Sequence, residues 1–221
     1  MRSFWDWGWL ARHLDLVGDR ILEHLWLTFL AVGIGLLIAF PLAVLAYRRP
    51  RWYPPLTSVT GILYTIPSLA LFAFLLPWTG LSTLTAEIGL VSYTLLILIR
   101  NTVTGFRGVP SELKEAARGM GYTKRQLLWR VELPLALPAI VGGLRIATVT
   151  TIGLVTVTAL IGQGGLGALM LGAFRRLFPQ FMIVVAVALS VALAIGFDAL
   201  FLLAQRGITP WSRTARVRGL Q

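Results

Sequence analysis

The chain has no cysteine among its 221 residues, and it has only nine Asp and Glu residues against twenty Lys and Arg residues. Without thiols, neither disulfides nor cysteine-ligated metals contribute to its fold. The two histidines, His13 and His24, are eleven residues apart among Asp15, Asp19 and Glu23. That pattern is typical of a mixed surface helix, so we predict no metal site.

A phosphate-binding loop of the Gly-x-x-x-x-Gly-Lys-Ser/Thr type is also missing. The glycine-rich stretch from Gly162 to Gly167 contains no lysine and follows no predicted strand. We therefore expect no catalytic residue and no cofactor on this chain, and we expect ATP and magnesium to be bound by a partner. For residues 160–181 we predict a tight bend and a short re-entrant or surface piece. A direct ligand contact by Gln163 is the alternative.

Long apolar runs dominate the sequence. Hydrophobic residues make up 57% of the chain and the mean hydropathy is +0.78, values that exclude an ordinary soluble domain. About 20 apolar residues in a helix cross the hydrocarbon core of a bilayer. The sequence thus predicts an all-α polytopic membrane protein in a lipid bilayer, with spans at about 25–47, 57–76, 85–106, 137–159 and 182–204. The net charge of +11 follows this topology and does not indicate nucleic acid.

The basic residues gather in alternate connections between the spans. They are frequent after the first span, after the third span and in the tail 206–221, and sparse elsewhere. By the positive-inside rule, the N-terminus is outside and the C-terminal tail is cytoplasmic. Residues 1–24 lack the features of a cleaved signal peptide and are expected to be an extracytoplasmic or interfacial segment. The tryptophans of this segment are Trp5, Trp7 and Trp9. Together with Trp26 they are expected to be interface anchors, and substrate binding is the alternative.

Residues 108–135, here called the polar insert, separate the third and fourth spans. Ser111 is predicted to cap a first short helix, and Thr123 with Gln126 fits a capping box for a second one, which Pro134 is predicted to close. On the first helix, Ala116, Ala117 and Gly121 are predicted to form a strip with almost no side chain, over which a partner backbone could approach closely. Glu115 borders that strip. An exposed amphipathic loop helix is the alternative.

Two charges fall within predicted spans, where an ionised side chain is costly unless it is paired or hydrated. Arg145 and Asp198 are expected at equal depth, which suggests an ion pair between the fourth and fifth spans; separate snorkelling is the alternative. Thr148, Thr151 and Thr158 share one helical face and suggest a polar lining for a solute path. Hydroxyls bonded back to their own helix are the more usual interpretation.

The polar insert resembles the cytoplasmic signature of permease subunits of ATP-binding-cassette importers. The signature runs Glu-Ala-Ala, three residues, Gly, nine residues, an aliphatic residue, one residue and Leu-Pro, and it departs only at Val131, where Ile is usual. Together with further motifs the chain looks like the osmoprotectant branch, for glycine betaine, carnitine or choline. These motifs are Ile66–Ala70, Arg100–Gly105, Glu115–Gly121, Val131–Pro138, Gly143–Ala147 and Ile161–Gly167.

This resemblance implies the type I importer permease fold with five core transmembrane helices, in a multi-pass protein of the bacterial inner membrane. It implies a second permease subunit, identical or paralogous, two ATPase subunits and a separately encoded extracytoplasmic solute-binding protein. The residues implied in coupling to the ATPase are Glu115, Ala116, Ala117, Gly119, Gly121, Leu133 and Pro134. The chain would form the translocation path by alternating access and would itself not be an enzyme. The alternatives are a permease for methionine or an oxyanion, a non-transporting membrane scaffold, and a secondary transporter, which five spans do not favour.

Overall fold

The computed structural model describes residues 7–175 and 180–208, and within those ranges the regular structure is helical. The helices are α1 (Trp7–Arg12), α2 (Leu14–Arg48), α3 (Tyr53–Thr65), α4 (Ser68–Thr79), α5 (Thr83–Arg107), α6 (Ser111–Gly119), α7 (Lys124–Leu127), α8 (Leu133–Thr158), α9 (Leu166–Arg175) and α10 (Gln180–Ile208). Short 3₁₀ turns (Pro50–Trp52, Ala159–Ile161) and a π turn (Leu128–Glu132) connect some of them. Trp5, Arg176 and most of the predicted basic tail lie outside the described residues.

Four helical stretches in the described part of the chain are long and apolar enough to cross a membrane. They are Leu14–Arg48, Thr83–Arg107, Lys124–Ile161 and Phe181–Ile208. The first begins eleven residues earlier than the sequence indicated, so much of the expected N-terminal segment is part of the same helix. The second expected span, 57–76, is not continuous: α3 and α4 meet at an angle of 96°, and only as a bent pair do they make a fifth span.

Proline causes this bend. Pro67 has no N–H to continue the ladder of α3, and it holds Ile66 in an extended conformation with ψ of 129°. The carbonyl of Ile66 is left without a helical partner and accepts a hydrogen bond from the Tyr93 hydroxyl of α5. Proline is often tolerated inside membrane helices, but here it divides the predicted span into two helices.

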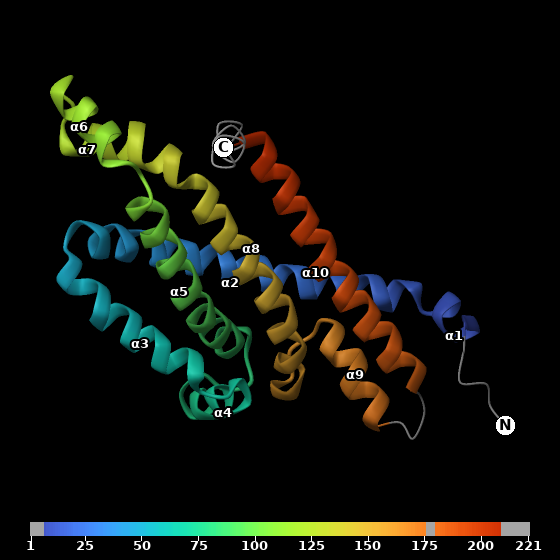
Figure 1. Cartoon of the computed structure of the whole chain (residues 1–221). Coiled ribbons are helices and arrows are strands. Elements are labelled where there is room, and N and C mark those ends of the chain that lie inside the picture. The colour runs from blue at the N-terminus through green and yellow to red at the C-terminus, as the bar shows by residue number, and fades with distance from the viewer. Residues whose placement is uncertain (1–6, 176–179, 209–221) are drawn as a thin grey trace.

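α5 lies in the middle of the bundle, between α2, α3 and α8 (Figure 1). Glycines bring the backbones close together. A Cβ on Gly35 of α2 would lie 2.0 Å from Oγ1 of Thr94, and one on Gly105 of α5 would lie 2.9 Å from the carbonyl oxygen of Ala136. Small residues at such crossings are the usual means of packing membrane helices. As a result, 61% of the apolar window of α5 is buried.

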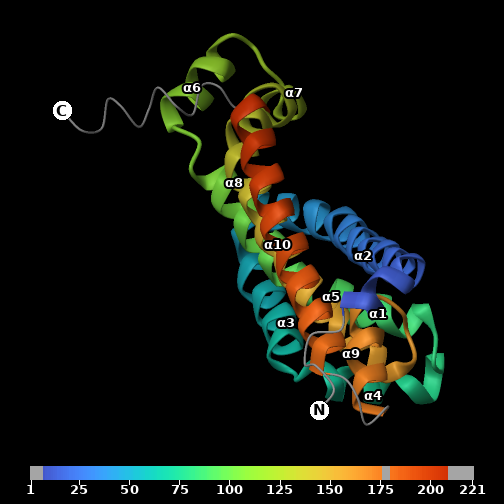
Figure 2. The ribbon, with the colours of Figure 1, turned by 90° about the vertical axis from the view of Figure 1, so that its right-hand side faces the viewer.

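α10 lies at the edge of this arrangement. It runs alongside α8 and packs on α8 and α9 (Figure 2). Only 6% of its apolar window is buried inside the chain. α6 and α7 lie at one end of the bundle, here called the insert end, and α4 and α9 lie at the opposite end, here called the far end.

Candidate functional site

α6 projects beyond the spanning helices at the insert end (Figures 1 and 2). It begins at Ser111, but Ser111 is not its cap: the cap position is occupied by Pro110, without a side-chain hydrogen bond. Glu115, Ala116 and Gly119 are exposed. Ala117, in contrast, is only 2% exposed, so its methyl group faces its own chain and not the outer surface. The small-residue strip expected from the sequence is therefore narrower than predicted.

The end of α6 explains why a glycine stands at position 121. The N–H of Gly121 donates to the Arg118 carbonyl at 2.9 Å, and the N–H of Tyr122 donates to the Ala117 carbonyl at 3.1 Å. This pair of bonds is the Schellman ending of a helix, which needs a left-handed residue after the cap. Gly121 supplies it with φ of +81°. A Cβ there would meet nothing within 4 Å, so the backbone and not the available space requires glycine.

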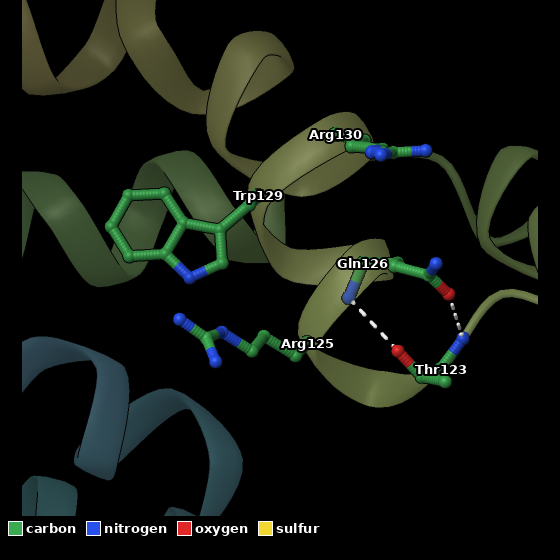
Figure 3. A pocket seen from close by; sticks show the side chains of 5 residues that line it. All are labelled: Thr123, Arg125, Gln126, Trp129 and Arg130. Atoms are coloured by element: carbon green, nitrogen blue, oxygen red, sulfur yellow. Dashed lines mark hydrogen bonds between the residues drawn. The ribbon is translucent and has the colours of Figure 1, made fainter.

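The predicted capping box of α7 is confirmed. Oγ1 of Thr123 accepts from the N–H of Gln126 at 3.3 Å, and the Gln126 side chain accepts from the N–H of Thr123 at 2.8 Å (Figure 3). The side chains of Arg125 and Trp129 lie on one side of this helix, and that of Arg130 lies on the other. These five side chains line a shallow cavity of about 350 Å³. Trp129 is 51% exposed and offers a large apolar contact next to two cationic groups.

Pro134 does not close the second helix of the insert, contrary to the prediction. The chain remains helical from Lys124 to Ile161, and Leu133 and Pro134 form the first turn of α8. The N–H of Leu133 reaches back to the carbonyl of Leu128, which makes the preceding turn a π turn. Such a turn is one way for a helix to accommodate the missing N–H and the bulky ring of proline. The polar insert is thus joined to α8 without a break.

Three contacts attach the polar insert to the ends of α2 and α5. The Tyr47 hydroxyl donates to Oε1 of Glu132 at 2.7 Å, and Nη2 of Arg48 donates to the Lys124 carbonyl at 3.1 Å. Nζ of Lys114 donates to the carbonyl of Phe106 at 3.3 Å. Glu132 is 5% exposed, so its bond to Tyr47 is shielded from water. These contacts make the insert part of the bundle and not a loose loop.

The cavity between α2 and the insert is strongly basic. It measures about 720 Å³ and is lined by Tyr47, Arg48, Arg49, Arg118, Tyr122, Lys124, Leu127 and Glu132. Four of these side chains are cationic and one is acidic, so the positive charge that the sequence placed in separate connections is brought together at the insert end. Sequence reasoning gave no role to Tyr47 or Glu132, because the two residues are 85 positions apart.

Arg145 of α8 and Asp198 of α10 are brought together. Nη2 of Arg145 donates to Oδ2 of Asp198 at 2.9 Å, and Nε donates to Oδ1. The contact is therefore bidentate, the strongest geometry for this pair of groups. About a third of each side chain remains exposed, 34% for Arg145 and 33% for Asp198.

Thr148, Thr151 and Thr158 lie on the buried face of α8 and are exposed by 1% or less. Thr151 donates to the Ala147 carbonyl and Thr158 to the Val155 carbonyl, which is the back-bonding that the sequence analysis gave as the usual alternative. The hydroxyl of Thr148 is buried without a hydrogen-bond partner, and none of the three residues lines the cavities at the insert end, at the far end or beside Arg145.

The glycine-rich stretch forms a tight bend at the far end, before α9. The N–H of Gly165 donates to Oε2 of Glu23 at 2.9 Å, and the N–H of Leu166 donates to Nδ1 of His24 at 3.3 Å. Because Nδ1 accepts, Nε2 carries the proton and donates to the Ile152 carbonyl at 2.9 Å, so the imidazole is neutral. His24 is fully buried, which corrects its expected place on a surface helix.

Gln163 lies in the same bend. Its side-chain oxygen accepts from Oγ1 of Thr83 at 3.0 Å. With Arg20 and Leu160 it borders a cavity of about 390 Å³ at the far end. Within the described residues, no group of three His, Asp or Glu side chains is arranged to hold a metal ion.

The chain is similar to membrane components of transport systems over most of its length. The family described as binding-protein-dependent transport system inner membrane component matches residues 31–210. The choline transport system permease protein OpuBB of Bacillus subtilis (strain 168) is 37% identical over 205 residues, covering 91% of this chain and 94% of that protein. The glycine betaine/carnitine/choline transport system permease protein OpuCB of the same organism is 36% identical over 188 residues, covering 85% and 86%.

Among solved structures, the MetNI methionine ABC transporter in an inward-facing conformation aligns with a TM-score of 0.81. The alignment covers 90% of this chain and 98% of that chain at 24% sequence identity, and it establishes the fold alone. The helical bundle, its apolar spans and this likeness describe a multi-pass membrane protein with the permease fold of type I importers. The chain belongs to the family of binding-protein-dependent transport system inner membrane components.

Proposed function

We propose that this chain is the permease subunit of an ATP-driven importer for osmoprotectants such as glycine betaine, carnitine and choline. The supporting observation is the 36–37% identity to two permeases named for these solutes, over 85–91% of this chain. A permease for methionine is the second candidate, because the solved methionine transporter shares the fold. At 24% identity that likeness carries no information about the solute.

The proposed importer contains two permease subunits, identical or paralogous, two ATPase subunits and an extracytoplasmic solute-binding protein. ATP and magnesium are bound by the ATPase subunits. The permease resides in the bacterial inner membrane with its N-terminus outside and its C-terminus inside. The basic cavity supports this orientation, since Arg48, Arg49, Arg118 and Lys124 gather at the insert end and cationic residues concentrate on the cytoplasmic side of membrane proteins.

The ATPase subunit is proposed to dock on the exposed side of α6 and on α7. Ala116 and Gly119 offer little side chain there, and Glu115, Arg125 and Arg130 offer charges around them. Movement of the docked insert would reach the membrane by two routes. One is the unbroken helix from Lys124 to Ile161, and the other is the Tyr47–Glu132 hydrogen bond to α2. Alternating access then results from rotation of the bundle about the substrate path.

The proposed solute class is tested by reconstitution of the permease with its ATPase subunits and binding protein in liposomes. Uptake of labelled choline is measured in competition with glycine betaine, carnitine and methionine. We expect the quaternary amines to compete and methionine to have no effect. Competition by methionine alone would replace the osmoprotectant assignment with the second candidate.

The docking surface is tested with single cysteines, because the natural sequence contains none. Ala116→Cys places a thiol on the exposed side of α6, and Ala117→Cys, one residue away, places it on the buried side. We expect a maleimide to label the first variant rapidly and the second slowly. Bound ATPase subunits should then protect Ala116→Cys but not Leu81→Cys, a control at the far end that is 70% exposed. Equal labelling of Ala116→Cys with and without the ATPase would disprove docking on α6.

A further inference from the structure

The Arg145–Asp198 pair lies well inside the spanning helices. Arg145 is twelve residues beyond the first residue of α8, and Asp198 is ten residues before the last residue of α10. At about 1.5 Å per residue, each is roughly 15–18 Å from the insert end of its helix. Because a third of each side chain is exposed, the pair is not sealed inside this chain.

Partly exposed charges at this depth are not stable against lipid tails. An ionised side chain in the hydrocarbon region is costly, so such groups normally face a bundle interior or a water-filled cavity. The pair borders a cavity of about 410 Å³, whose other lining residues are Gly142, Ile146, Val149 and Thr150. That volume is in the range of roughly 300–1,000 Å³ that small-molecule sites occupy. On this argument the face that carries Arg145 and Asp198 lies against water or another subunit in the assembled protein, and not against lipid.

The exposed face of α8 continues from this cavity towards the far end. Three exposed residues follow one another at intervals of seven: Ile146 and Gly153 of α8, and Leu160 of the 3₁₀ turn after it. They therefore mark one continuous face. Leu160 also lines the far-end cavity that contains Arg20 and Gln163. One exposed face of α8 thus leads from the far end to the ion pair, opposite to the buried face with Thr148 and Thr151.

The chemistry of the pair matches a small zwitterion with a quaternary ammonium and a carboxylate. A carboxylate can take the two guanidinium N–H groups that Asp198 now holds. A quaternary ammonium has no N–H to donate, so it is attracted by charge alone and would lie against the Asp198 carboxylate, with its methyl groups near Ile146 and Val149. Each end of such a solute thus replaces one member of the internal ion pair.

We propose that Arg145 and Asp198 form a zwitterion-binding site on the exposed face of α8, along which the solute crosses the membrane. The ion pair between them opens when the solute binds and closes again when it leaves. The proposal rests on the proposed function, and it names the residues that contact the solute within the permease. It also predicts a preference inside the membrane: a zwitterion engages both residues, whereas choline engages Asp198 only and must displace Arg145 without compensation.

The test uses the permease–ATPase complex in nanodiscs without the binding protein. Equilibrium binding of labelled glycine betaine and choline is measured for the natural protein and for three variants, Arg145→Gln, Asp198→Asn and the doubly neutral Arg145→Gln/Asp198→Asn. We expect betaine affinity to fall at least about tenfold in all three, because each loses a charge-assisted contact. Choline affinity should fall in the two variants that lack the Asp198 charge and should be retained or raised in Arg145→Gln. Arg51→Gln, which removes an exposed charge away from this cavity, is the matched control.

Unchanged betaine binding by a correctly assembled double variant would overturn the proposal, and so would the absence of betaine binding by the natural complex. If no variant assembles, the natural complex decides the question. Betaine should raise its unfolding temperature, whereas 3,3-dimethylbutyrate, in which carbon replaces the charged nitrogen, should not; equal shifts would overturn the site. A second measurement separates failure of this site from failure of the proposed function. If only the site is wrong, betaine-loaded binding protein still stimulates ATP hydrolysis by the natural complex. If the proposed function is wrong, it does not.

Discussion

The Tyr47 hydroxyl donates a 2.7 Å hydrogen bond to Oε1 of Glu132, which joins the last turn of α2 to the π turn of the polar insert. The carboxylate is 5% exposed, so water does not replace a lost donor easily. Loss of a partner by such a buried group costs roughly 1–3 kcal/mol. We expect Tyr47→Phe to lower the unfolding temperature of the purified permease by several degrees and to reduce transport more than it reduces ATPase binding.

Tyr122→Phe is the matched control, because Tyr122 lines the same cavity. Thermal unfolding and uptake are measured for both variants. Equal effects of the two changes would mean that the Tyr47–Glu132 bond has no particular role in holding the insert.

Gly164 packs directly against Glu23. A Cβ at this position would lie 1.9 Å from Oε2 of Glu23, the same atom that accepts from the N–H of Gly165. We expect Gly164→Ala to displace the carboxylate and lower the unfolding temperature, and we expect Glu23→Ala in the same chain to recover part of the loss. Gly61→Ala, in an open position on α3, is the control and should be neutral. No recovery in the double variant would show that the clash is not with Glu23.

Gly121 separates two explanations for a glycine in the polar insert. If its left-handed φ of +81° is what matters, Asn should be tolerated, since Asn adopts that conformation readily, whereas Val is an outlier there and costs roughly 1–3 kcal/mol. We expect Gly121→Val to abolish solute uptake with normal membrane insertion and Gly121→Asn to retain most uptake. Loss of uptake in both variants would indicate that the partner needs a bare backbone at this position.

The carboxylate of Glu87 is buried near the start of α5, and neither of its oxygens has a hydrogen-bond partner. A buried polar group without a partner is destabilising by roughly 1–3 kcal/mol. We therefore expect Glu87→Met, which is apolar and similar in shape, to raise the unfolding temperature in a thermal melt. A lower unfolding temperature would show that the carboxylate itself stabilises the folded chain.

The proposed orientation places the far end of the bundle outside the cell and the insert end inside, and this can be tested by labelling. Ala116 belongs to α6 at the insert end, and Leu81 lies between α4 and α5 and lines the far-end cavity; both are exposed. In intact cells, a membrane-impermeant maleimide should label Leu81→Cys and leave Ala116→Cys unmodified until the membrane is opened. The reverse pattern would invert the proposed topology.

Features set by neighbouring residues could be predicted from the sequence. The Thr123–Gln126 capping box is a contact across three positions, and the apolar runs indicated α5, α8 and α10 because each is a continuous helix. The depth of Arg145 and Asp198 suggested a pair because both positions count from the same end of the bundle. These inferences needed only helix geometry and hydropathy.

Features that depend on packing were missed. Hydropathy gave no sign that His24 is buried, because its two ring bonds are to backbone groups of Ile152 and Leu166, more than 120 residues away. The face of α8 that is exposed could not be derived from the threonine pattern, since that pattern marks the buried side. Hydropathy also predicts one span over 57–76, whereas Pro67 divides it and the Tyr93 hydroxyl satisfies the carbonyl that the bend leaves free.

The bare flank of α10 has a consequence for how this protein is made in the cell. A helix with 6% of its apolar window covered by its own chain receives most of its contacts from outside it. Lipid or another subunit of the proposed importer supplies these contacts, and a copy without that subunit leaves the flank to lipid and to membrane proteases. Cellular amounts of the chain should follow the supply of its partners.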